Sequence, residues 1–154
     1  MSVLGVGLDL VEVAPFARQL DVVGSCFAES TFTDDELAIA KEAVVKAAAT
    51  DQLALARHLA ARFAAKEAFV KAWSMARAGQ PPAMDDVEWK CIEVVSDPWG
   101  RPSLVVHGET ERRVQESLGP TMSSLSLTHE DSVAAAVVVL SRTTPTVGKA
   151  GGAS

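Results

Sequence analysis

Cysteine is scarce in this chain of 154 residues, which has only two. Cys26 and Cys91 form no CxxC pair and no Cys/His cluster, which argues against a disulfide framework and a zinc site. Long hydrophobic runs are also lacking, because a run such as Val133 to Leu140 is far shorter than the roughly 20 residues that span a bilayer. The N-terminus lacks the basic patch and long apolar stretch of a signal peptide. We therefore expect a soluble, cytoplasmic protein with no membrane partner.

Basic residues are outnumbered, with 14 Lys and Arg against 20 Asp and Glu and a net charge of -6. This excess of negative charge disfavours nonspecific binding to nucleic acid, so no nucleic acid partner is expected. The charges are nevertheless unevenly distributed: acidic residues gather between residues 34 and 42, and basic residues dominate between residues 57 and 77. The basic stretch is where we expect phosphate groups to bind.

The length and a hydrophobic content of 48% predict a single domain with one core. We place this domain at residues 1–142. Residues 143–154 consist almost entirely of Thr, Pro, Gly, Ala and Ser, a composition that supplies almost no core residue. We therefore expect a disordered C-terminal tail.

Hydrophobic patterning predicts an α+β fold. Residues 3–13 are nearly continuously apolar, which suits a strand buried on both faces, and residues 51–76 contain no Gly or Pro and repeat apolar residues every three or four positions, as in a long helix. A capping box of Thr33 and Glu36 predicts a second helix to about residue 46. Further helices are expected at residues 15–20 and 109–118, and strand pairs at 89–95 with 103–106 and at 123–128 with 133–140.

Asp9 stands out, because an ionised carboxylate in a strand suited to burial is costly unless it is paired or bound to a cation. A simpler interpretation, given equal weight, is that Asp9 lies near the strand end and accepts hydrogen bonds from backbone groups. Gly5 and Gly7 form a GxG, but no third glycine follows at the required spacing, which argues against a dinucleotide site.

The long helix carries two stripes of charge, since Lys66 follows Arg62 by four residues and Lys71 follows Glu67 by four. On helix statistics alone, a solvated face with an ordinary Glu67–Lys71 ion pair is favoured. His129 ends a predicted strand, where a side chain can reach a cleft or simply face solvent. Together, two carboxylates for a hard divalent cation, several cationic side chains for phosphate oxygens and a histidine are a suitable set for phosphoryl chemistry.

At these residues the chain resembles the holo-acyl-carrier-protein synthases, the small trimeric class of 4′-phosphopantetheinyl transferases. The matching segments are residues 6–10, 62–71 and 126–129, with further similarity at Phe32-Thr33, Glu36-Leu37 and 99–102. The resemblance covers about residues 3 to 140. It implies the family fold, an antiparallel sheet packed against a long helix and shorter helices.

The implied activity is transfer of the 4′-phosphopantetheine arm of coenzyme A to a serine of apo-acyl carrier protein, leaving adenosine 3′,5′-bisphosphate. Asp9 and Glu67 are implied to be Mg²⁺ ligands, and Mg²⁺ commonly uses only one or two carboxylates plus substrate phosphates and water. Lys71 is implied to neutralise the pyrophosphate, and the three residues Asp9, Glu67 and Lys71 are the implied catalytic set. The implied coenzyme A contacts are Lys71, with weaker candidates Arg62 and Lys66, and, at the nucleotide end, Gly100, Arg101, Pro102 and His129.

The resemblance further implies in-line attack of the carrier serine on the β-phosphorus. Either Glu67 or a metal-bound water accepts the serine proton, and we favour a water held by Glu67. A homotrimer with active sites between subunits is also implied. The first helix of the family usually offers several basic residues to the carrier protein, whereas residues 14–24 offer only Arg18, so we expect more hydrophobic docking through Phe16 and Leu20.

Two other interpretations remain. A noncatalytic module that binds coenzyme A or a carrier protein would use Asp9 and Glu67 structurally. A domain of a larger fatty-acid synthase would perform the same chemistry on an attached carrier, although the Met1 start and the short tail favour a free-standing enzyme.

Overall fold

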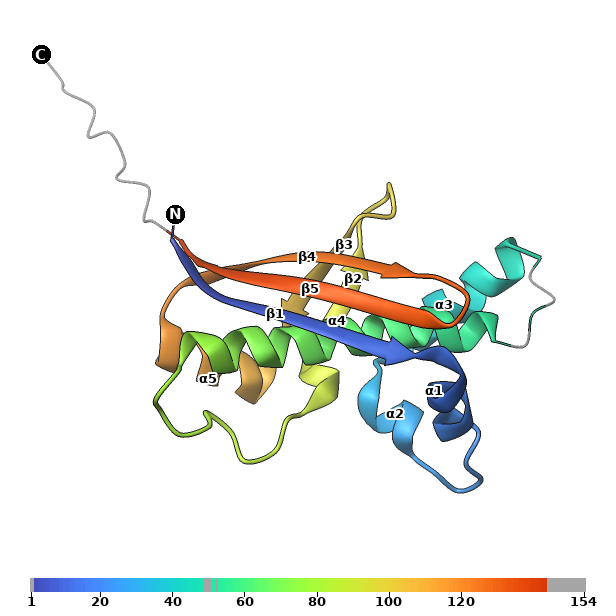
Figure 1. Ribbon diagram of the computed structural model, residues 1–154, viewed down its shortest axis with the longest axis horizontal. Helices are drawn as coiled ribbons and strands as arrows, with labels where there is room; N and C mark the ends of the chain where they lie inside the picture. Colours follow the sequence, from blue (N-terminus) through green and yellow to red (C-terminus); the bar gives the residue numbers. More distant parts are fainter. Residues whose placement is uncertain (1, 49–50, 52, 144–154) are drawn as a thin grey trace, which may run out of the picture.

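A computed structural model describes residues 2–48, 51 and 53–143 of the protein, and the remainder of the predicted tail lies outside these residues. The predicted α+β class is confirmed: a three-stranded antiparallel sheet of order β1-β5-β4 and a separate β2–β3 hairpin accompany a long helix (Figure 1). The elements are β1 Val3–Glu12, α1 Val13–Leu20, α2 Phe27–Thr31, α3 Asp34–Lys46, α4 Ala54–Ala76, the 3₁₀ turn η1 Trp89–Cys91, β2 Ile92–Ser96, β3 Pro102–Val106, α5 Gly108–Leu118, β4 Thr121–His129 and β5 Val133–Arg142.

Helix α4 is the central element, and the sheet lies along it while α1 and α2 lie near one end and α5 near the other (Figure 1). Its buried residues are mostly alanines, so its backbone can approach a neighbour closely. Strand β1 uses this: a Cβ on Gly5 would lie 2.1 Å from the Ala72 carbonyl oxygen, and one on Gly7 would lie 1.9 Å from that of Ala68. The two glycines therefore serve strand-on-helix contact, in agreement with the absence of a dinucleotide fingerprint.

The expectation that β1 is buried on both faces is wrong. Gly5, Gly7 and Asp9 face α4, whereas alternate residues on the other side are exposed, with Leu8 65% and Leu10 61% exposed. The apolar run includes residues from both faces of the strand. One face packs on the helix, and the other is an uncovered apolar surface in the single chain. No helix within the described residues has the length and hydropathy needed to cross a bilayer.

Aromatic side chains fasten α1 and α2 to α4. The Phe16 ring lies 5.8 Å from Phe27 and 5.6 Å from Phe63, measured between centroids, and Phe63 in turn lies 5.7 Å from Trp89. Phe16 is only 4% exposed, so its expected role in hydrophobic docking is not supported by its position. Burial of such rings is favoured by the large apolar area they remove from water.

The capping signal predicts the start of its helix correctly, whereas the short elements are predicted less well. The Thr33–Glu36 capping box forms as predicted and begins α3, because each side chain accepts a hydrogen bond from the other residue's backbone. The expected strand at residues 89–95 instead begins with η1, since its first residues make a tight turn closed by a Cys91 N–H to Glu88 carbonyl bond. Helix α2 was not expected at all.

Candidate active site

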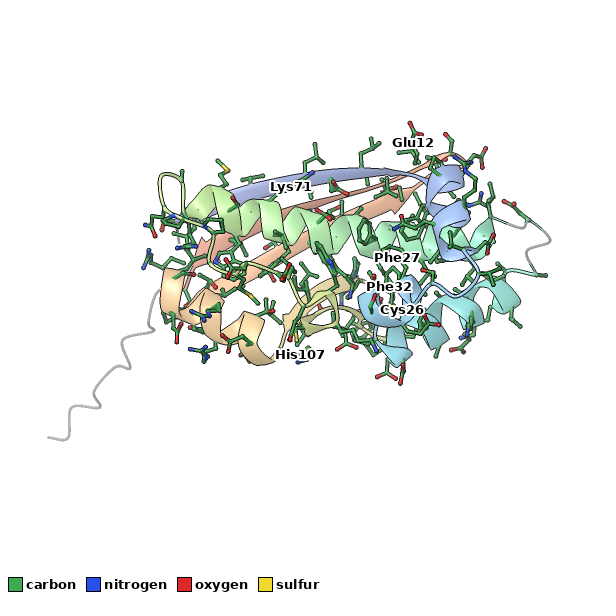
Figure 2. All side chains as sticks on the ribbon, turned by 90° about the horizontal axis from the view of Figure 1, so that it is seen from below. Glu12, Cys26, Phe27, Phe32, Lys71 and His107 are labelled. Atoms are coloured by element: carbon green, nitrogen blue, oxygen red, sulfur yellow. The ribbon has the colours of Figure 1, made fainter. Side chains whose placement is uncertain are left out.

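Asp9 and Glu67 line one hollow of about 460 Å³, together with Glu12, Phe16 and Phe63. We call it the acidic hollow. Asp9 is brought there by β1, whose glycines allow the strand to lie on α4, and Glu67 projects from α4 itself. Lys71, one turn further along α4, places its Nζ 2.7 Å from Asp9 Oδ1 and 3.3 Å from the Leu8 carbonyl oxygen. Figure 2 shows Lys71 beside β1.

The ammonium of Lys71 pairs with Asp9 rather than with Glu67, so the simple Glu67–Lys71 pair favoured by helix statistics is not the observed one. Partial burial, followed by the neighbouring charge of Asp9, raises the pKa of Glu67, and Lys71 opposes this only in part. The hydrogen bond to Asp9 raises the pKa of Lys71. The acidic hollow is therefore lined by three carboxylates, Asp9, Glu12 and Glu67, and the Lys71 ammonium pairs with the first of them.

This charge balance suits a hard cation. The carboxylates of Asp9 and Glu67 come from different elements and repel each other, and desolvation makes the ionised form of Glu67 less favourable, which a cation would relieve. Within the described ranges no cluster of three or more His, Cys, Asp or Glu side chains has the arrangement of a complete metal cage. Mg²⁺ often takes one or two protein carboxylates and completes its shell with water and substrate phosphates, so the Asp9 and Glu67 side chains are chemically suited to it.

Gly100, Pro102 and His129, which sequence analysis assigned to the nucleotide end, line a second hollow of about 240 Å³ together with Arg62, a weaker candidate for phosphate contact. We call it the basic hollow. Arg62 comes from α4, Gly100 and Pro102 from the β2–β3 hairpin, and His129 from the end of β4. The hairpin tip is shaped by Asp97, whose Oδ1 accepts hydrogen bonds from the backbone N–H groups of Trp99 and Arg101. Gly100 has a φ of +81°, a conformation that favours glycine.

Two predicted phosphate contacts lie elsewhere. Lys66 has no exposed surface, and its Nζ donates to Glu36 Oε2 at 2.8 Å and to the Trp89 carbonyl at 3.0 Å. Burial lowers the pKa of Lys66, although Glu36 opposes this. Arg101 is exposed, pairs with Asp97 at 2.6 Å and lies 5.0 Å from the Trp99 ring. Neither side chain lines the acidic or the basic hollow, and each is paired with a carboxylate instead.

His58 was missed by sequence analysis. It lines the basic hollow from α4, and its ring centroid lies 5.1 Å from that of His129. A spacing signal was present, since His58 precedes Arg62 by four residues and therefore shares its helix face. Helical periodicity could not identify His129 as the partner of His58, however, because His129 comes from a distant strand. A third hollow, of about 190 Å³ beside Trp73, contains none of the predicted site residues.

The two hollows open on different sides of α4. Arg62 and Glu67 are five residues apart, and at 3.6 residues per turn their side chains diverge by about 140°. A single helix thus carries the carboxylate of one hollow and the guanidinium of the other. Because the two hollows lie on different sides of α4, one ligand lying against one face of a single chain does not reach both.

Comparisons with known proteins identify the family of this chain. A profile described as the 4′-phosphopantetheinyl transferase superfamily matches residues 5–138. A curated holo-[acyl-carrier-protein] synthase from Mycolicibacterium smegmatis is 44% identical over 140 residues, spanning 91% of this chain and 98% of that relative.

Solved structures show the same relationship. The Chronobacterium ammoniagenes ACPS-CoA complex has a TM-score of 0.81 at 38% identity, covering 94% of this chain and 100% of that one. The acyl carrier protein synthase of Mycobacterium tuberculosis has a TM-score of 0.68 at 39% identity, covering 92% and 100%. The chain therefore belongs to the 4′-phosphopantetheinyl transferase superfamily, among the holo-[acyl-carrier-protein] synthases.

Proposed function

We propose that this protein transfers the 4′-phosphopantetheine group of coenzyme A to a serine of apo-acyl carrier protein, giving holo-acyl carrier protein and adenosine 3′,5′-bisphosphate. The observation that carries the proposal is the acidic hollow, in which Asp9 and Glu67 from separate elements meet beside Lys71. Family membership supplies the reaction class, and the related Chronobacterium structure is a complex with CoA. With these substrates the reaction belongs in the cytoplasm.

Mg²⁺ is the proposed metal, with Asp9 and Glu67 as its protein ligands. When bound there it would offset charge on the nonbridging oxygens of the pyrophosphate. The Lys71 ammonium is half exposed and 2.7 Å from Asp9. It is therefore positioned at the rim of the acidic hollow, where it can neutralise a pyrophosphate oxygen while keeping its carboxylate partner.

In the proposed reaction the serine Oγ attacks the β-phosphorus in line. The new O–P bond forms as the bond from that phosphorus to the bridging oxygen breaks, and adenosine 3′,5′-bisphosphate leaves. The serine proton passes to Glu67 through a water that its carboxylate holds. The position of Glu67 in the acidic hollow beside Asp9 suits this role, because a general base must lie within reach of the proton that it accepts.

The nucleotide end is proposed to bind the basic hollow through Arg62, the Gly100–Pro102 turn and His129. Arg62 supports this assignment, because it is only 9% exposed and its Nε has no hydrogen-bond partner among the described residues. A buried guanidinium nitrogen without a partner is costly, and a phosphate oxygen would satisfy it. Lys66 is left out of this set because its ammonium would have to abandon Glu36 to reach a ligand.

A homotrimer with active sites between subunits is proposed on two grounds. The uncovered face of β1 presents Val3, Val6, Leu8 and Leu10, all large apolar residues, and such a surface favours association. The acidic and basic hollows also face different sides of α4, so one coenzyme A can use the acidic hollow of one subunit and nucleotide contacts from a neighbour. Each subunit interface would then complete one site.

Carrier docking is proposed to use α1 and the segment after it. Arg18 is the basic residue of this helix, and it is exposed. Because Phe16 is buried, the apolar contacts come instead from Val22 and Val23, which are 57% and 100% exposed. An acidic carrier surface with an apolar centre fits this combination.

The test is intact-mass analysis of an apo-acyl carrier protein incubated with coenzyme A, Mg²⁺ and the protein. We expect a mass gain of one phosphopantetheine group, lost with a chelator and strongly reduced in Asp9→Ala and Glu67→Ala. Glu42→Gln, on the exposed face of α3, is the matched control and should keep full activity. Coenzyme A binding without any mass gain on several carriers would instead favour a noncatalytic binding module.

A further inference from the structure

Two histidines from distant parts of the chain meet in the basic hollow. His58 lies in the first half of α4, His129 at the end of β4, and their rings make an edge-to-face contact with an interplanar angle of 70°. Arg62 lines the same hollow one turn after His58. Three nitrogen-bearing side chains therefore surround a space that carries no carboxylate among the described residues lining it.

The charges that face His58 are all positive. Arg57 and Arg62 come from its own helix, His129 comes from β4, and the hairpin contributes the uncharged residues Val94, Ser96, Gly100 and Pro102. Arg57 is engaged elsewhere, with Asp51 and with the backbone carbonyl of Asp131 in the β4–β5 turn. Burial first, and then these neighbouring charges, lower the pKa of His58 below its usual value of 6.5. The ring is therefore mostly neutral at neutral pH while the hollow contains no ligand.

We propose that His58 is a specificity-determining residue for coenzyme A: with His129 and Arg62 it contacts the 3′-phosphate, and it takes up a proton when that phosphate enters the basic hollow. The proposal rests on the proposed binding of the nucleotide end in this hollow. It predicts that selectivity for coenzyme A over dephospho-coenzyme A, which lacks only the 3′-phosphate, decreases as pH rises.

The sign follows from linkage between proton and ligand binding. A phosphate dianion beside His58 favours the imidazolium, so the pKa of His58 is higher with the phosphate bound than without it. Between these two values the complex holds one more proton than the free protein, and affinity falls by up to about tenfold for each unit of rising pH. The phosphate itself has a second pKa of about 6. That ionisation is identical for every variant, so it cancels when variants are compared at one pH.

The experiment measures KM for coenzyme A and for dephospho-coenzyme A from about pH 6 to about pH 8.5, with carrier protein in excess. In the wild type we expect the ratio of the two KM values, dephospho-coenzyme A over coenzyme A, to be highest at low pH. His58→Phe keeps a ring beside His129 but removes both nitrogens, and it should lower the ratio and flatten its pH dependence. His58→Lys keeps a positive charge throughout and should hold the ratio high at alkaline pH.

His107→Phe is the matched control, because His107 pairs with Glu93 and is not among the residues that line the basic hollow. Its ratio should match the wild type. A wild-type ratio and pH profile in His58→Phe, with a reduced ratio in Arg62→Ala, would overturn the role of His58 while leaving the basic hollow as the nucleotide site. An unchanged ratio in Arg62→Ala and His129→Ala as well would overturn that assignment too.

Discussion

At the residue scale, the Glu67 carboxylate that is proposed to act in the reaction also lowers the stability of the folded protein when it is ionised. Its raised folded-state pKa means that the folded protein holds the Glu67 proton more tightly than the unfolded chain, whose carboxyl titrates near the ordinary value of 4.5. Stability contributed by this group is therefore present at low pH and is lost as pH rises through the raised pKa. At neutral pH the ionised side chain opposes folding through desolvation and through its repulsion with Asp9.

Glu67→Gln should therefore raise the melting temperature of the metal-free protein near neutral pH, and the gain should vanish near pH 4, below both pKa values. The same substitution should reduce turnover by about a hundredfold or more, because it removes a proposed metal ligand and proton acceptor. Thermal melts in chelator and carrier-modification rates measure the two effects. Near-normal turnover at saturating Mg²⁺ would contradict both roles of Glu67.

Lys66 is the second residue for which burial determines how much a substitution changes the free energy of unfolding. Glu36 accepts hydrogen bonds from Lys66 Nζ at 2.8 Å and from the Val94 and Thr33 backbone N–H groups, each at 3.0 Å, and it has no exposed surface. Lys66→Met should reduce the free energy of unfolding by about 3–5 kcal/mol, since it leaves a buried carboxylate without its cation.

Urea denaturation would measure this loss. The matched control is Lys46→Met, which breaks the exposed Lys46–Glu42 pair and should cost less than about 1 kcal/mol. A loss of similar size in both variants would mean that burial adds nothing to the Lys66–Glu36 pair.

Single residues were predictable from sequence when their local setting was unusual. Asp9 was identified because a carboxylate is rare in an apolar strand, and the structure gives it Lys71 as a partner. Lys66 was predicted as a phosphate contact because spacing of four residues defines a helix face without saying what covers it, and α3 covers this one with Glu36. His58 was missed for the same reason, since the His129 ring that completes its setting lies 71 residues further along the chain.

At the element scale, the contact between β1 and α4 depends on two missing side chains. Gly7→Ala should destabilise the fold by about 1–3 kcal/mol or more, because its Cβ would meet the Ala68 carbonyl oxygen at 1.9 Å and the Ala72 nitrogen at 2.6 Å. Both atoms belong to the backbone of a helix and cannot move aside easily. The strand must shift instead, and Asp9 shifts with it.

Denaturant unfolding and carrier modification would be measured together for this variant. Val105→Ala, at a 38% exposed position of β3, is the control and should change the stability much less. Full activity and wild-type stability in Gly7→Ala would show that the strand has more freedom than its packing indicates.

Whole elements were predicted well where the signal was local and long. The uninterrupted helical pattern identified α4, and the capping box located the start of α3 correctly, because both depend on residues within one or two turns. Burial of β1 on two faces was predicted wrongly because an apolar run does not distinguish a second packed layer from a surface that awaits another molecule. The turn at residues 89–91 has no comparable pattern.

At the scale of the whole molecule, the uncovered apolar face of the sheet is the basis for predicting assembly. Leu8→Glu puts a charge at the centre of this face, on a side chain that is 65% exposed in the single chain. We expect light scattering coupled to gel filtration to show a trimer for the wild type and smaller species for this variant, with loss of carrier modification.

Ile39→Glu, which charges a 40% exposed residue of α3, is the matched control and should remain assembled. A wild-type protein that sediments only as an active monomer would contradict the proposed trimer. Circular dichroism of Leu8→Glu separates loss of assembly from loss of folding.

The pairing of β1 with β5 also affects how the chain folds during its synthesis. Residues 3–12 find their hydrogen-bonding partners at 133–141, almost the full length of the sequence away. On the ribosome, the strand that carries Asp9 must wait for β5 before its edge is paired, even though α4 has emerged long before. A nascent chain that ends before residue 133 therefore leaves β1 as an open, apolar edge, the form most exposed to aggregation and most dependent on chaperones.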